Sequence, residues 1–186
     1  MTNIQFPAGL INHDIEFFDF NNQTLAIHNG MVKNFEELPS SIHDIIWNYF
    51  STKPEIIQAL EDNGFKTKKS KIKKFTSCRF GGFDTVSDIQ NLSVNQSEYF
   101  DCGNRGNCSM EGIVCSFPKF NNHVLSPFEL KIIKLLSTEL TLPAIADEMK
   151  VCANTLDNKK KVLFEKFKVL SRPRLVALAF QNNLIL

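Results

Sequence analysis

Helix-start signals recur in the last third of the chain, and they constrain its fold more than any other feature. Ser126–Glu129 supplies a capping hydroxyl, a first-turn proline and a capping-box acid ahead of an apolar run. Thr141 precedes a second run, in which Pro143 suits the first turn, and a third helix is expected to start near Cys152. These spacings predict an all-α domain of short helices at residues 121–186.

The expected third helix has two different faces. Leu156 and Leu163 lie seven residues apart, a spacing that suits packing against neighbouring helices. Asn154, Asn158 and Lys161 recur at steps of four and three on another face. Amides can pair with adenine edges and lysines with guanine edges or phosphates, so this face suits the major groove of DNA. A plain helical bundle with a solvated polar face would show the same periodicity.

The charge of the chain is unevenly distributed. Residues 125–186 hold ten Lys and Arg against six Asp and Glu, a net charge of +4, and the rest of the chain carries −3. The overall charge of +1 hides this difference. A basic C-terminal part favours contact with a polyanion.

From Leu125 to Ala179 the sequence resembles the LuxR/GerE-type helix-turn-helix domain without a gap. The resemblance is carried by Leu125-Ser126-Pro127-x-Glu129, Ile132-Ile133-x-Leu135-Leu136, Ile145-Ala146-Asp147-Glu148-Met149, Val151, Thr155, Asn158-Lys159-Lys160-Lys161, Lys166-Phe167 and Leu175-Val176-Ala177-Leu178-Ala179. It implies a four-helix fold, a homodimer, and double-stranded DNA as the partner, with the third helix in the major groove.

Carried over by position, the resemblance gives residues of the third helix expected roles. Thr155 would contact phosphate, whereas Asp157, Asn158 and Lys161 would face the groove, and the neighbouring lysines would contact the flanking backbone. With Asn154 from the polar face added, the predicted DNA-binding residues are Asn154, Thr155, Asp157, Asn158, Lys159, Lys160, Lys161 and Lys166.

Four positions depart from the pattern of this family. Glu139 stands where glycine is usual after the first helix, so we expect a less tight or strained turn there, and Lys168 replaces another usual glycine. Asp157 stands where lysine is common, and an acid there would repel phosphate but could accept from cytosine N4. Cys152 replaces a Ser or Thr cap and is interpreted either as a plain small residue or as a redox-sensitive thiol.

Residues 1–120 are predicted to form an α+β domain that precedes the helical one. Residues 15–20 and 24–27 read as the strands of a hairpin, with Asn21-Asn22 as its turn. One helix is expected after a cap at Ser40 or Ser41, and another is expected to run from Pro54 to Asn63-Gly64. Residues 75–123 show little periodicity.

A lysine-rich run at Lys66–Lys74 holds six lysines. It can be read as a solvated loop or exposed helix end, or as an auxiliary patch that contacts phosphate.

Four cysteines lie in the segment 78–115, outside the helical domain. Four thiolates suffice for a tetrahedral zinc site or, less favoured here, an iron–sulfur cluster. The predicted metal ligands are Cys78, Cys102, Cys108 and Cys115. Free or buried thiols and a reversible disulfide switch are the alternatives. This segment faintly resembles a Cys-rich module of uncharacterised bacterial and prophage proteins, which carries no known function.

The predicted function is therefore a sequence-specific DNA-binding transcriptional regulator and not an enzyme. The sequence holds no glycine-rich phosphate loop, nucleophile elbow or paired His–Glu protease motif. We expect a cytoplasmic protein without a membrane segment, because no apolar run reaches about 18 residues. The alternatives are a metal- or redox-sensing regulator controlled by the cysteine site, and a protein-interaction module that has lost DNA binding. The effector and the operator are not written in the sequence.

Overall fold

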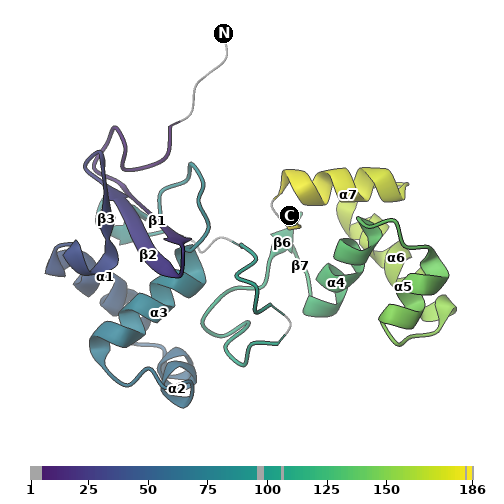
Figure 1. Ribbon diagram of the computed structural model, residues 1–186, viewed down its shortest axis with the longest axis horizontal. Coiled ribbons are helices and arrows are strands. Elements are labelled where there is room, and N and C mark those ends of the chain that lie inside the picture. The colour runs from purple at the N-terminus through teal and green to yellow at the C-terminus, as the bar shows by residue number, and fades with distance from the viewer. Residues whose placement is uncertain (1–5, 96–98, 106, 183, 186) are drawn as a thin grey trace, which may run out of the picture. The chain divides into compact units, whose positions relative to one another are not determined.

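The computed structural model describes residues 6–95, 99–105, 107–182 and 184–185 (Figure 1). The chain divides into two compact units. The first comprises Met1–Cys102 with Asn107–Ser116, and the second comprises Gly103–Gly106 with Phe117–Leu186. The first unit combines an antiparallel sheet with helices and the second is built mainly from helices, so the predicted mixture of α and β structure is confirmed.

The sheet of the first unit has the strand order β3-β2-β1-β4-β5, and every neighbouring pair is antiparallel. Its strands are β1 (Ile15–Phe20), β2 (Gln23–His28), β3 (Met31–Asn34), β4 (Ile89–Gln90) and β5 (Ser93–Val94). The predicted hairpin is confirmed, with Phe17 opposite Ala26. Asn21 and Asn22 both take a positive φ, of 49° and 61°, which asparagine tolerates in a two-residue turn.

Three helices share one core with the inner face of this sheet (Figure 1). They are α1 (Ser40–Phe50), α2 (Pro54–Asp62) and α3 (Lys68–Phe80), preceded by the short 3-10 helix η1 (Phe35–Glu37). Phe17 of β1, Phe50 of α1, Leu60 of α2 and Phe75 of α3 are fully buried in that core. The prediction of a serine cap for α1 is wrong, because the helix already begins at Ser40 and Pro39 precedes it as N-cap.

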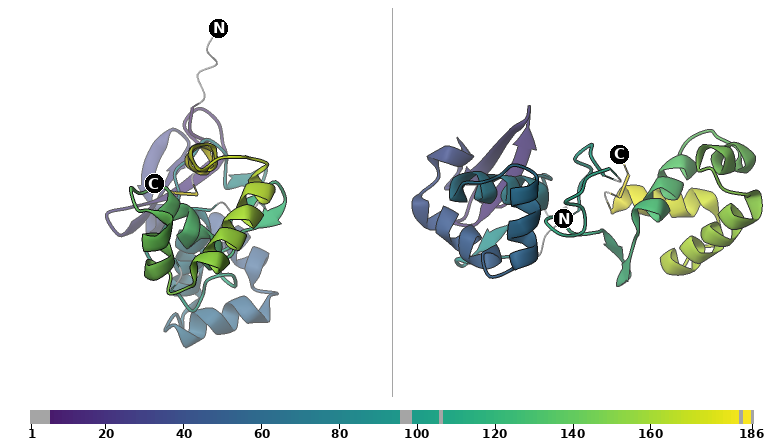
Figure 2. Two further views of the ribbon diagram at one scale, coloured as in Figure 1. Left: turned by 90° about the vertical axis from the view of Figure 1, so that its right-hand side faces the viewer. Right: turned by 90° about the horizontal axis from the view of Figure 1, so that it is seen from below.

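The second unit opens with a two-stranded hairpin, β6 (Lys119–Phe120) and β7 (His123–Val124). Four helices follow (Figure 2): α4 (Pro127–Leu136), α5 (Leu142–Glu148), α6 (Ala153–Phe167) and α7 (Arg172–Gln181). The predicted helix starts are confirmed, because the Ser126 hydroxyl accepts from the Glu129 amide at 3.2 Å and Thr141 caps α5 in the same way.

The hairpin belongs to the helical unit rather than to the preceding one. The Phe120 ring stacks on Phe167 of α6 with centroids 4.0 Å apart, and the Asn121 amide donates to the Lys166 carbonyl at 3.2 Å. The boundary predicted after residue 120 falls inside this hairpin, because the continuous part of the second unit starts at Phe117.

The turn between α4 and α5 is closed by an arginine and not by a glycine. Arg172, at the start of α7, donates to the carbonyls of Leu136 and Thr138 at 2.7 Å each and to that of Leu140 at 3.1 Å. Glu139 does not adopt a positive φ, so the expected strain at this position is absent.

Candidate nucleic-acid interface

Helix α6 is held in place by one apolar side. Leu156, Leu163 and Phe167 are buried, and they anchor the helix to the rest of its unit. At its C-terminal end Lys168 adopts the left-handed conformation (φ 53°, ψ 48°), and the amides of Lys168 and Val169 donate back to carbonyls of the last turn. The exposed polar residues of α6, among them Asn154 and Asn158, lie outside this buried stripe.

The predicted reading residues lie together on an accessible part of α6. Asn154, Asn158 and Lys161 are exposed, and their spacing places them on one side of a regular helix. Lys159 is exposed beside them. This arrangement offers amides and ammonium groups to an external partner, which is what base-edge and phosphate contacts need.

Asp157 is tied to the lysines that follow it. Its Oδ1 lies 2.7 Å from Nζ of Lys160, and its Oδ2 lies 2.9 Å from Nζ of Lys161. Hydrogen bonds from these two ammonium groups lower the pKa of Asp157 to about 2. The carboxylate is ionised at neutral pH and offsets part of the positive charge of this surface.

Two other predicted contact residues have partners inside the unit. Lys166 forms an ion pair with Glu129 of α4 at 2.6 Å. The Thr155 hydroxyl lies 3.0 Å from the Cys152 sulfur. Asn154, Asn158, Lys159 and Lys161 are therefore the more accessible members of the predicted set, and Lys166 mainly joins two helices.

Cys152 occupies the N-cap of α6 and is exposed. The hydrogen bond with the Thr155 side chain, followed by those from the backbone amides of Thr155 and Asn154, lowers the pKa of the thiol. A lower thiol pKa increases the thiolate fraction near neutral pH and with it the reactivity of the sulfur.

Most of the lysine-rich run forms the first half of α3, and several of its lysines form ion pairs with acidic residues. Lys68 pairs with Asp44 at 2.8 Å, and Lys73 pairs with Glu36 at 2.6 Å. Lys71 is nearly buried and pairs with Glu61 at 2.6 Å. These contacts favour a structural role for the run over a phosphate-binding one.

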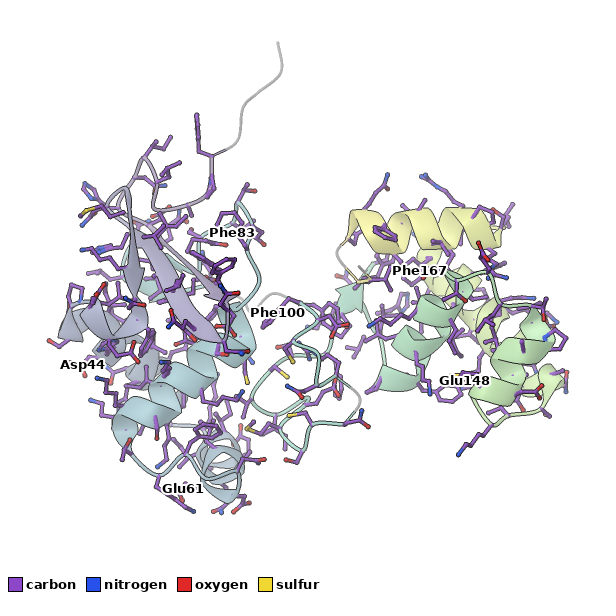
Figure 3. All side chains as sticks on the ribbon, in the orientation of Figure 1. Asp44, Glu61, Phe83, Phe100, Glu148 and Phe167 are labelled. Atoms are coloured by element: carbon purple, nitrogen blue, oxygen red, sulfur yellow. The ribbon has the colours of Figure 1, made fainter. Side chains whose placement is uncertain are left out.

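The cysteine-rich segment packs onto the core of the first unit. Met110 and Val114 are buried in that core, and Arg79 of α3 donates to the Val114 carbonyl at 3.3 Å. The segment is thus held by ordinary core contacts, which the sequence pattern did not reveal. Figure 3 shows several sulfur atoms in the loops that follow Phe100.

The predicted metal ligands differ in burial. Cys115 is buried, Cys78 and Cys108 are half-buried, and Cys102 is exposed. Burial, assisted by the electrostatic influence of Cys115 and Cys102, raises the pKa of Cys78 to about 11, although Lys74 opposes the shift. Cys78 is therefore an electrostatic neighbour of two other predicted ligands. Among the described residues, no group of three or more His, Cys, Asp or Glu side chains is arranged to hold a metal ion.

Within the ranges that the structure covers, no helix has the length and apolar character needed to cross a membrane. The chain matches no protein-family model, no curated protein and no solved structure.

Proposed function

We propose that the second unit is a LuxR/GerE-type helix-turn-helix domain and that the chain is a sequence-specific transcriptional regulator that binds DNA without catalysing a reaction. One observation carries the proposal: α6 buries one side and exposes Asn154, Asn158 and Lys161 on another. Together with α5 and the short turn before it, α6 would form the helix-turn-helix. Such a regulator would act in the cytoplasm.

The exposed lysines and asparagines of α6 would contact different parts of the DNA. Lys159 and Lys161 would neutralise phosphates and supply salt-dependent affinity, whereas Asn154 and Asn158 would read base edges. Each helix can read only a short half-site, so a homodimer on a two-fold symmetric operator is the expected complex.

The test measures the affinity of the full chain for duplexes selected from a random pool, by fluorescence anisotropy at low and high salt. Replacing both Asn158 and Lys161 by Ala should weaken binding at least about tenfold, because base and phosphate contacts are lost together. The matched control is Lys131→Ala, which removes an exposed charge from α4 and should have little effect. Unchanged affinity in the double variant would refute the proposal. Salt-insensitive or absent binding by the unaltered chain would favour a protein-interaction module, which the pairing of Asp157 with two lysines supports.

A second proposal concerns regulation by the cysteines. We propose that Cys78, Cys102, Cys108 and Cys115 hold a zinc ion, and that an iron–sulfur cluster is the less favoured occupant. The presence of all four thiols within residues 78–115, outside the helical unit, supports this proposal. Metal analysis of protein purified without oxygen should find about one zinc per chain. Cys78→Ser should abolish the binding and Cys152→Ser should preserve it. Protein free of metal would refute the proposal. A visible charge-transfer band would show that the occupant is an iron–sulfur cluster and not zinc.

A further inference from the structure

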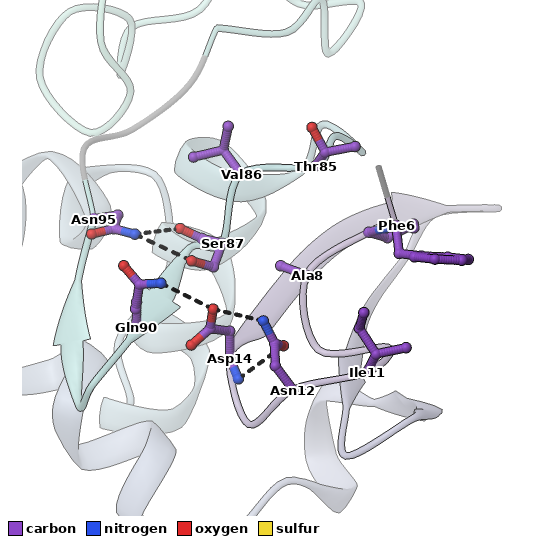
Figure 4. Close-up of a pocket in the computed structure, with 11 residues that line it drawn as sticks. Phe6, Ala8, Ile11, Asn12, Asp14, Thr85, Val86, Ser87, Gln90 and Asn95 are labelled. Carbon is purple, nitrogen blue, oxygen red and sulfur yellow. Dashed lines mark hydrogen bonds between the residues drawn. The ribbon is translucent and has the colours of Figure 1, made fainter. Parts of the chain in front are cut away.

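The first unit contains a pocket of about 440 Å³ that the proposed function does not use (Figure 4). Its walls come from the N-terminal loop that precedes β1 and from the segment around β4 and β5. This volume is within the usual range for small-molecule sites. Gly9 holds the loop close to the sheet, because its φ is +74° and a Cβ atom would collide with the Ile27 carbonyl oxygen.

One wall of the pocket is rich in hydrogen-bond acceptors. Asp14 Oδ2 accepts from the side-chain amides of Asn12 at 3.0 Å and Gln90 at 3.1 Å. The Asn95 amide donates to the Ser87 carbonyl oxygen at 2.6 Å. At least one N–H of each amide is thus directed at the protein itself, and Asp14 Oδ1 and the amide oxygens of Gln90 and Asn95 are the acceptors that this wall offers a ligand.

The negative charge of this wall also favours a ligand that donates hydrogen bonds. Asp14 is the only charged side chain among the described residues that line the pocket. No lysine, arginine or histidine of those lining residues stands beside it to neutralise it. A cationic ligand would therefore gain from this carboxylate, whereas an anionic one would be repelled.

Apolar side chains at the rim of the pocket are open to solvent. Ile11 is 74% exposed and Val86 is 66% exposed, and the Phe6 ring lies at the same rim. Figure 4 shows Ile11 and Phe6 on one side of the pocket, with Gln90 and Asn95 on the other. A ligand with an apolar body would remove these side chains from water, which is favourable in proportion to the area covered.

We propose that this pocket binds a small organic ammonium ion, a protonated primary amine that carries an aryl or branched alkyl group. An ammonium group has three donors and no acceptor, so it matches a wall of one carboxylate and two amide oxygens. Its apolar body lies against Phe6, Ile11 and Val86. The site is independent of the DNA-binding surface and needs no metal.

Calorimetric titration of the full chain at neutral pH tests the proposal with three probes that share one ring: 2-phenylethylamine, 2-phenylethanol and phenylacetate. The amine should bind saturably, the alcohol more weakly, and the acid not at all. Failure of the amine to bind below about 10 mM, or equal binding of the acid, would overturn the proposal.

Substitutions of residues that line the pocket test whether the amine binds there. Asp14→Asn should weaken binding of the amine at least about tenfold, because a charge-assisted hydrogen bond becomes a neutral one. The matched control, Asp62→Asn on the exposed side of α2, should leave binding unchanged. Ile11→Ser alters an exposed side chain and so preserves the fold, and it should weaken 2-phenylethylamine more than methylamine. Unaltered binding in folded Asp14→Asn or in Ile11→Ser would overturn the proposal.

Discussion

The Nζ atom of Lys166 lies 2.6 Å from Oε1 of Glu129, so an ion pair joins the last turn of α6 to the first turn of α4. The other carboxylate oxygen accepts from the Ser126 backbone amide at 2.9 Å and from its hydroxyl at 3.1 Å. Burial opposes ionisation of Glu129, but the hydrogen bonds from Lys166 and Ser126 outweigh it and lower the pKa of this carboxyl. One acid thus fixes both the cap of α4 and the position of α6.

Replacing Lys166 by Met should therefore destabilise the second unit, by about 2 kcal/mol, because it leaves a nearly buried carboxylate without its cation. Urea denaturation followed by far-UV circular dichroism measures the loss. Lys131→Met, which changes an exposed lysine of α4, should cost much less. Equal stability of the two variants would show that the ion pair contributes nothing to the fold.

Asp157→Asn should strengthen binding to duplex DNA about two- to fivefold at low salt, because Lys160 and Lys161 lose their acidic partner. The gain should shrink at high salt, where charges are screened. Anisotropy titrations at two salt concentrations measure both effects. Glu165→Gln, which removes an exposed acid from the same helix, controls for net charge. A loss of affinity in Asp157→Asn would instead indicate that this carboxylate accepts a hydrogen bond from a base.

Lys168→Gly should stabilise the second unit by about 1 kcal/mol, because a left-handed residue with a Cβ is strained and glycine is not. Thermal denaturation checks the prediction. Lys168→Ala removes the same charge and keeps the Cβ, so it should give no such gain. A larger gain with Ala than with Gly would attribute the effect to charge.

Glu16 should make the stability of the first unit depend on pH. It is fully buried, and burial together with the nearby Asp84 charge raises its pKa to about 8, from an ordinary value of 4.5, although the Asp84 amide opposes the shift. Between about pH 4.5 and about pH 8, the Glu16 carboxyl keeps its proton in the folded state and loses it in the unfolded state. The stabilisation is therefore complete below about pH 4.5 and declines as the pH rises towards about 8, by roughly 4 kcal/mol.

Glu16→Gln carries no titrating proton and should flatten this dependence in urea denaturation at about pH 5 and about pH 8. Glu55→Gln, at an exposed site on α2, should leave the slope of the parent chain intact. A slope that survives in Glu16→Gln would mean that another group causes it.

Cys152 should react with iodoacetamide at neutral pH before Cys78 does. The pKa of Cys152 is lowered and its thiol is exposed, whereas burial raises the pKa of Cys78. Mass spectrometry of the partly modified protein gives the order. Modification should also weaken duplex binding, because the added group stands beside Thr155 on α6. Faster reaction at Cys78 would contradict the assigned environments.

Local signals were readable in the sequence because their causes lie within a few residues. The turn at Asn21-Asn22 depends on the backbone conformation of those two residues. The helix starts at Ser126 and Thr141 depend on a side-chain hydroxyl that accepts a hydrogen bond from the backbone amide three residues later. Each of these features was predicted correctly. The exposed polar face of α6, with Asn154, Asn158 and Lys161, also followed from periodicity, and its role in DNA binding stays a prediction.

Features that depend on distant partners were missed. Ile89 of β4 pairs with Ile15 of β1, and a strand of two residues has no pattern of its own. The sequence did not predict the full extent of helix α3, because its lysines mask the apolar periodicity. Lys71 is buried, although lysine is usually exposed. Gln90 meets Asp14 from 76 residues away, so the pocket had no signature along the chain.

The hydrogen bonds from Arg172 to the α4–α5 turn do not depend on which side chains the turn carries. All three acceptors are main-chain oxygens, those of Leu136, Thr138 and Leu140. Substitutions at 139 and 140 leave these oxygens in place, so a single distant arginine can preserve the shape of the turn whatever side chains stand there.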